Sequence, residues 1–168
     1  MRKAALAAVV GAAIAALVAG VALAASGGAR SGAVVKTRKT SLGTILVDSK
    51  GRTLYLFEKD KHGKSACSGQ CAAFWPPLIT SGKPGAGAGV KASLLGTTSR
   101  AGGKLQVTYK QHPLYRFAQD RKAGQTKGEE LKAFGAEWYA VSPAGAKVEK
   151  GGSDNSGGGG YGGGGYGG

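Results

Sequence analysis

Short runs rich in apolar, aromatic and β-branched residues, separated by polar turn residues, recur along the chain between residues 42 and 149. The runs 42–47 and 53–57 flank an Asp-Ser-Lys-Gly turn, a pattern typical of a β-hairpin with a short Gly-containing loop. Two more pairs have the same form, at 94–99 with 105–109 and at 138–141 with 146–149. Because each run is short and ends at Gly- or Pro-containing turns, the pattern predicts a mainly β protein.

One of these runs occurs twice, sixty positions apart. Leu-Tyr-Leu-Phe-Glu-Lys-Asp at 54–60 and Leu-Tyr-Arg-Phe-Ala-Gln-Asp at 114–120 share Leu, Tyr, Phe and Asp in register. The first copy has apolar residues on both faces and is predicted to be interior. The second has Arg116 and Ala118 on one face and Pro113 at its start, so it is predicted to lie near an edge or a solvated side. Such self-similarity indicates a duplicated supersecondary unit.

Each copy leads through a polar stretch to a short segment with helical features and then to a Trp. Residues 68–74 have room for about two helical turns before Trp75-Pro76-Pro77. Residues 126–134 begin with a capping-box pattern and precede Gly135. We therefore predict a mainly β fold with a minor α+β character. It is a single small domain of two pseudo-symmetric β-rich repeats, about 42–80 and about 90–149, with two short helices.

The two ends of the chain have compositions unlike the centre. Arg2 and Lys3 precede 21 uncharged residues that end in Ala22-Leu23-Ala24, which predicts a secretory signal peptide over 1–24. An uncleaved N-terminal membrane anchor is the alternative. Residues 25–40 are predicted to be a flexible lead, 41–150 the duplicated domain, and 151–168 a disordered Gly/Tyr-rich tail. The protein is thus expected outside the cytoplasm, secreted or in the cell envelope.

The chain is strongly basic. Without Arg2 and Lys3 it has 21 Lys and Arg residues against nine Asp and Glu, a net charge of +12. A field of this sign favours anionic partners, and export points to an anionic cell-wall polymer or a membrane surface instead of nucleic acid. The sequence indicates no specific protein partner.

Cys67 and Cys71 are the only cysteines, and the predicted export places them in an oxidising compartment. We expect a disulfide that closes a very small loop and fixes the segment before Trp75. A redox pair is one alternative. A metal site for copper, iron or haem is another, with His62 and His112 as the imidazoles available as further ligands, although no cofactor is expected.

Asp60 and Asp120 occupy equivalent positions at the ends of the two repeated runs. Paired acids suggest a hydrolase. The stronger interpretation is structural, with each carboxylate accepting from backbone N–H groups two residues further on. The aromatic residues of the two copies are expected to form a shared core, with an aromatic ligand cleft as the alternative; they are Tyr55, Phe57, Trp75, Tyr115, Phe117 and Trp138.

Three motifs together resemble those of a bacterial envelope family described as secreted repeats of unknown function, or predicted lipoproteins with a Tyr-x-aromatic-x-x-Asp motif. They are the Tyr-x-Phe-x-x-Asp pair, the Cys67–Cys71 segment leading to Trp75-Pro76-Pro77-Leu78, and His112-Pro113-Leu114-Tyr115. The resemblance covers 42–148 and implies export, a duplicated domain and no established reaction. The lipid-modified Cys of such lipoproteins is missing here. We expect a non-enzymatic envelope protein that binds or associates with anionic surface material.

Overall fold

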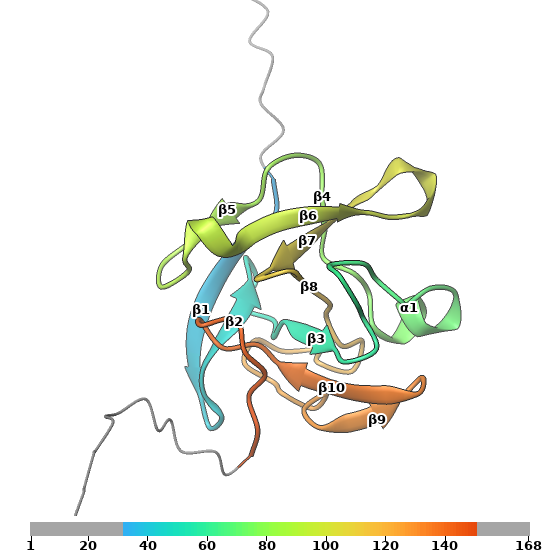
Figure 1. The fold of residues 1–168 in the computed structure, drawn as a ribbon. Helices are drawn as coiled ribbons and strands as arrows, with labels where there is room; N and C mark the ends of the chain where they lie inside the picture. Colours follow the sequence, from blue (N-terminus) through green and yellow to red (C-terminus); the bar gives the residue numbers. More distant parts are fainter. Residues whose placement is uncertain (1–31, 151–168) are drawn as a thin grey trace, which may run out of the picture.

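The computed structural model describes residues 32–150, which form three small sheets and one short helix (Figure 1). The strands are β1 (Val34–Thr40), β2 (Gly43–Asp48), β3 (Tyr55–Phe57), β4 (Ile79–Thr80), β5 (Gly85–Ala86), β6 (Leu95–Ser99), β7 (Leu105–Tyr109), β8 (His112–Pro113), β9 (Leu131–Ala133) and β10 (Ala136–Ala140). The helix is α1 (Gln70–Phe74), and the 3-10 turns are η1 (Ala92–Leu94) and η2 (Ala101–Gly103). The predicted mainly β single domain is confirmed.

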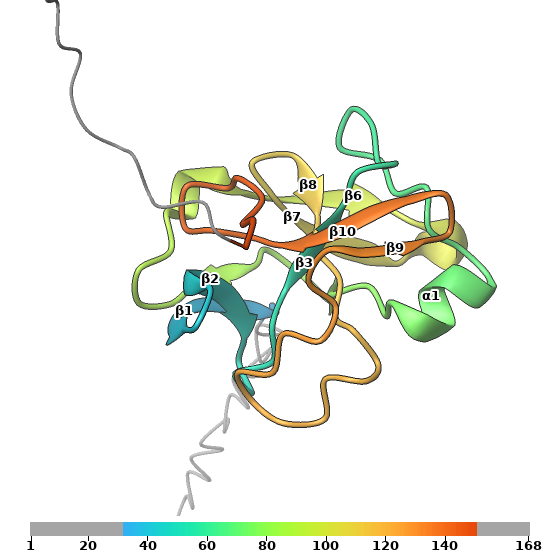
Figure 2. The same cartoon turned by 90° about the horizontal axis from the view of Figure 1, so that it is seen from below.

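The sheets are built mostly from antiparallel neighbours. Their strand orders are β2-β1-β5, β3-β10-β9 and β4-β7-β6, with β8 paired to β7. The predicted hairpin of β6 and β7 is present, with Leu95 opposite Tyr109 and Ser99 opposite Leu105. Seen from below in Figure 2, β3 lies against β10, and β9 borders β10 on its other side. Each sheet therefore brings together segments that are distant in sequence.

The segment through β3 lies between two apolar clusters and contributes to both. Tyr55 and Phe57 pack into one cluster, whereas Leu54 and Leu56 pack into the other. All four side chains are buried, because successive residues of a strand point to opposite faces. The prediction that the first copy of the repeated run is interior is confirmed.

The second copy of the run is not an edge strand, contrary to prediction. Tyr115 is fully buried and bridges Tyr55 on one side and Pro77 on the other. The regular strand β8 ends at Pro113, just before the run. The polar position Arg116 retains partial exposure, with 25% of its side chain accessible. The run is thus flanked by protein, with one solvated point at Arg116.

Of two predictions from local pattern at the N-terminal side, one is wrong and the other holds only in part. Part of the predicted flexible lead over 25–40 is strand β1, which pairs with β2 from Val35 opposite Asp48 to Thr40 opposite Gly43. The predicted hairpin of 42–47 and 53–57 is formed only near its turn, where the Asp48 N–H donates to the Arg52 carbonyl, Val47 bridges Thr53 and the Leu54 N–H donates to the Leu46 carbonyl; further along, β3 pairs with β10. The strand was not predicted because its exposed positions carry Lys and Arg, which give 25–40 the composition of a flexible segment. Residues 25–31 lie outside the described residues, as do the predicted signal peptide and tail.

The first predicted helix is present as α1, but the second is not. Residues 126–130 form turns, and Leu131–Ala133 is strand β9, paired with β10 through Leu131 opposite Trp138. The Glu129 carboxylate accepts the N–H of Ala140 instead of completing a helix cap. Pairing with β10 provides backbone hydrogen bonds that an isolated helix of about two to three turns cannot match, so tertiary contacts override the capping pattern.

Candidate functional site

The two copies of the repeated run meet at their tyrosines. The Tyr55 N–H donates to the Tyr115 carbonyl at 2.9 Å, and the Tyr115 N–H donates to the Tyr55 carbonyl at 3.0 Å. The side chains repeat this exchange: the Tyr55 hydroxyl donates to Asp120 Oδ2 at 2.6 Å and the Tyr115 hydroxyl to Asp60 Oδ2 at 2.7 Å. Each motif tyrosine therefore bonds the motif aspartate of the other repeat, around a local pseudo-twofold axis.

The other carboxylate oxygen of each aspartate orders a loop, but over a longer span than predicted. Asp60 Oδ1 accepts the N–H of Ala66, six residues on, and Asp120 Oδ1 accepts the N–H of Lys127, seven residues on. Burial raises the pKa of both carboxyls, partly offset by these N–H groups and by the tyrosines. Each aspartate thus ties its own loop to the opposite repeat.

The aromatic residues of the two repeats form one continuous stack. The rings of Trp75 and Trp138 are parallel, with centroids 3.9 Å apart. Phe57 covers the free face of Trp138 at 4.0 Å, and Phe117 covers Trp75 at 4.3 Å. The order Phe57, Trp138, Trp75, Phe117 alternates between repeats, so neither repeat has this core without the other.

The predicted disulfide between Cys67 and Cys71 is formed, with the two Cα atoms 5.3 Å apart. Both cysteines are buried, and Cys71 lies within α1. The bridge closes the turn just before Trp75 and borders a cavity of about 510 Å³.

The two histidines lie in different surroundings. His62 is exposed in the loop after Asp60, with a positive φ of 51°. His112 is half-buried in β8 and lines a hollow of about 410 Å³ together with Asp60, Lys61 and Lys147. Burial, together with the charge of Lys110, lowers the pKa of His112. Within residues 32–150 no group of three or more His, Cys, Asp or Glu is arranged to hold a metal ion.

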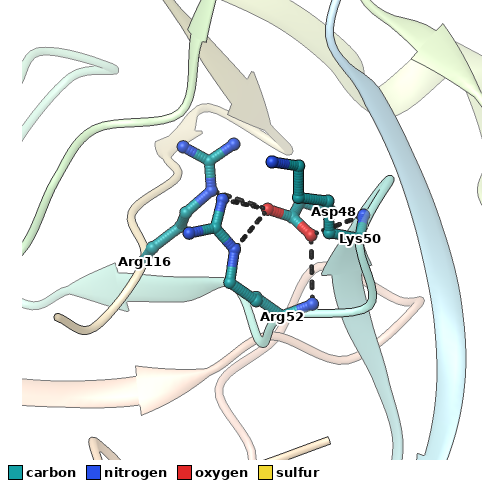
Figure 3. Close-up of polar contacts among 4 residues, drawn as sticks. All are labelled: Asp48, Lys50, Arg52 and Arg116. Atoms are coloured by element: carbon teal, nitrogen blue, oxygen red, sulfur yellow. Dashed lines mark hydrogen bonds and ion pairs between the residues drawn. The ribbon is translucent and has the colours of Figure 1, made fainter. Parts of the chain in front are cut away.

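A buried ion cluster centred on Asp48 is a feature that the sequence did not predict (Figure 3). Asp48 Oδ1 accepts the N–H groups of Lys50 and Arg52 at 2.9 and 3.0 Å. Asp48 Oδ2 accepts hydrogen bonds from the Nε–H of Arg52 at 3.0 Å and from the Nε–H of Arg116 at 2.7 Å. The Asp48 side chain is only 1% exposed, so two arginines share one buried carboxylate.

The electrostatics of this cluster favour the ionised carboxylate. Burial alone would raise the pKa of Asp48, but the N–H of Arg52 and the guanidinium of Arg116 outweigh it and hold the pKa below its usual value. A signal for the cluster was present in the sequence. Arg116 stands where the first copy has the buried Leu56, and a charge at an interior strand position requires a partner.

Three cations without carboxylate partners lie near Asp48, on β1 and on the turn after β2. Lys36, Arg38 and Lys50 line a hollow of about 270 Å³ whose wall includes Asp48. The Arg38 side chain lies against the turns at Gly51 and Gly124. A Cβ atom added at Gly51 would lie 3.2 Å from Arg38 Nη1, and one added at Gly124 would lie 2.9 Å from Arg38 Nε. We define the cationic surface as the residues Lys36, Arg38, Lys50, Arg52 and Arg116. Of these five, Arg52 and Arg116 pair with Asp48, whereas Lys36, Arg38 and Lys50 have no carboxylate partner in the described residues.

Glu129 is a second buried carboxylate, and it is incompletely paired. Its Oε2 accepts the N–H of Ala140 at 2.7 Å, whereas its buried Oε1 has no hydrogen-bond partner in the described part of the chain. Burial raises the pKa of Glu129 to about 7. Because this pKa lies above the usual 4.5, the folded state binds the proton more tightly than the unfolded state.

Replacing Glu129 by glutamine is expected to stabilise the protein at pH 8 by about 2 kcal/mol, because a neutral amide removes a buried charge and keeps the acceptor for Ala140. In the wild type, the contribution of Glu129 to the free energy of unfolding falls as pH rises from about 4.5 to about 7. The gain of the variant should therefore disappear at pH 4. Urea unfolding across this range measures it, with Glu58→Gln, which does not contribute to the pKa of Glu129, as control. Parallel pH profiles for the wild type and Glu129→Gln would contradict the assignment.

The fold and the crossed contacts define a class: small duplicated β domains in which each repeat completes the core of the other. The family model described as "Secreted repeat of unknown function" matches residues 36–79 and 96–142, one match per repeat. The chain belongs to this family of secreted repeats. No curated protein and no solved structure matched the chain. In residues 32–150 no helix has the length and apolar character needed to cross a membrane.

Proposed function

We propose that this secreted-repeat protein is a non-enzymatic binding module that attaches to an anionic polymer of the cell envelope through its cationic surface. The observation that carries the proposal is the unequal use of charge. Within residues 32–150 each of the eight acidic side chains accepts a hydrogen bond from the protein or forms an ion pair with one of its lysines or arginines. Ion pairs involve only Arg52, Arg116, Lys147 and Lys150, which leaves 16 of the 20 Lys and Arg in this range without a carboxylate partner.

The geometry of the cationic surface supports attachment to a repeating anion. Arg116 uses only Nε toward Asp48, and its two Nη atoms have no hydrogen-bond partner in the described structure. Lys36, Arg38 and Lys50, which line the hollow next to Asp48, are exposed. Planar guanidinium groups and flexible ammonium groups in one area can bind several phosphates or carboxylates of one polymer together.

Neutralising three of these cations tests the proposal. We expect the triple variant Lys36→Gln, Arg38→Gln and Lys50→Gln to reduce retention on purified, anionic cell wall by about tenfold or more at low salt, since each cation near an anionic surface contributes up to about 1 kcal/mol. Retention of the wild type should itself fall with added salt, because exposed charges are screened.

The control has the same net charge. Lys64→Gln, Lys83→Gln and Lys132→Gln alter exposed lysines outside the cationic surface and should reduce retention by less than about threefold. Equal losses in the two triple variants would show that overall charge alone is responsible and would refute a defined surface. Equal or tighter binding to anionic lipid vesicles would favour a membrane surface over the polymer.

A further inference from the structure

The cavity beside the disulfide is formed by two segments distant in sequence. One wall comes from the loop after Asp60, with Ser65, Cys67 and Ser68, and the other from the turn between β6 and β7, with Ser99, Arg100 and Lys104. Its volume is about 510 Å³, within the range of small-molecule sites. The loop wall contains the disulfide, which the second repeat lacks, so the cavity belongs to the part where the repeats differ.

Arg100 is the central side chain of this cavity. Its Nη1 donates to Ser65 Oγ at 2.5 Å and to Gln106 Oε1 at 2.7 Å, and its Nη2 donates to the Cys67 carbonyl at 2.6 Å. These bonds use three of the five N–H groups of the guanidinium. They fix the orientation of Arg100 and leave the Nε–H and one Nη2–H without a partner in the described structure.

The charge of Arg100 is not paired directly. Its three acceptors are neutral, and none of the ion pairs in residues 32–150 includes it. The side chain is partly buried, so its charge is less well solvated than that of a free arginine. A fixed guanidinium with free donors on two adjacent nitrogens can bind a carboxylate or phosphate in a bidentate manner. The exposed Lys104 supplies a second cation on the same wall.

The rest of the lining is apolar. Ala72, Pro77 and Ile79 border the cavity, and Ile79 is one of the few large apolar side chains left exposed. We propose that this cavity binds a small organic anion, whose carboxylate or phosphate group contacts Arg100 and Lys104 and whose small apolar group covers Ala72, Pro77 and Ile79. None of these residues belongs to the cationic surface, so this site is separate from the proposed polymer attachment.

Titration of the isotope-labelled exported chain with phenyl phosphate, benzoate and inorganic phosphate tests the site by NMR. We expect phenyl phosphate or benzoate to shift the Arg100 Nε–H and the backbone amides of Ser68 and Gly69, with an affinity about tenfold or more above that of phosphate because the ring covers the apolar wall. Equal affinities for phenyl phosphate and phosphate would overturn the proposal that the apolar wall of the cavity contacts the ligand. Shifts distributed over surface lysines, with none at Arg100, would overturn the site.

Two variants that leave the Arg100 hydrogen bonds intact make the test specific. Lys104→Gln should weaken phenyl phosphate binding by about threefold or more, whereas Lys132→Gln, with the same loss of charge on β9, should have no effect. Ile79→Ala should weaken phenyl phosphate but not phosphate. Equal effects of Lys104→Gln and Lys132→Gln would show general attraction by a basic protein and would refute the proposal. Retention of each variant on cell wall reports the polymer surface independently.

Discussion

Replacing Trp138 by alanine is expected to lower the free energy of unfolding by about 4 kcal/mol, the largest single effect in this protein. Trp138 is fully buried, with Phe57 stacked on one face, Trp75 on the other and Tyr115 packed edge-on. Removing the indole leaves a cavity that two repeats border, and neither can close it without separating its own strands. Since domains of this size have total stabilities of about 5–15 kcal/mol, the variant should be close to unfolding.

Urea unfolding followed by circular dichroism measures this loss. Stacked indoles couple their transitions, so the exciton signal of Trp75 and Trp138, the two tryptophans of the chain, should vanish together with the stability. Trp138→Phe retains a stacked ring and should cost about half as much. Phe134→Ala removes an aromatic ring that is 37% exposed and should cost less than about 1 kcal/mol. A similar small loss for Trp138→Ala would mean that the stack is not the core of the fold.

Replacing Asp48 by asparagine is expected to destabilise the protein by about 3 kcal/mol at pH 7. The amide keeps one acceptor but no charge, so the guanidinium groups of Arg52 and Arg116 lose their common counter-ion. Removing one partner of a buried pair costs up to about 5 kcal/mol, and the partial exposure of both arginines reduces this figure through solvent screening.

The loss should depend on pH in one direction. The pKa of Asp48 is lowered in the folded state from its usual 3.8. Its stabilising contribution is therefore complete above about pH 5 and is lost as pH falls through the folded pKa. Unfolding measurements at pH 7 and pH 3 should show the wild type approaching Asp48→Asn at the lower pH. Glu58→Gln breaks an exposed pair with Lys147 and should change stability by less than about 1 kcal/mol. A pH-independent difference for Asp48→Asn would exclude the ionised cluster.

The duplicated run shows how much of the core the sequence specifies. Alternation within 54–57 placed Tyr55 and Phe57 on one face and Leu54 and Leu56 on the other, and both faces are buried as predicted. The pairing of Cys67 with Cys71 and the short helix before Trp75 also follow from local sequence. These features depend on residues a few positions apart, where steric preference and chain connectivity leave few alternatives.

The predictions failed where a distant segment decided the conformation. The lead became strand β1 because β2 offers its backbone donors and acceptors along six residue pairs. The capping pattern at 126–129 was overridden because β10 offers a partner for β9. In both places the local sequence is only weakly structured by itself, so pairing in the sheet determined the result.

The sequence by itself determined the repeated unit, its apolar faces, the disulfide and the basic character of the chain, because each depends on residue type or short spacing. The tertiary structure decided how the two units meet. Tyr55 bonds Asp120 across 65 positions and Tyr115 bonds Asp60 across 55, whereas Asp48 reaches Arg116 across 68. Hydrogen bonds and ion pairs act over a few ångströms of space, and only the folded chain brings such distant residues within that range.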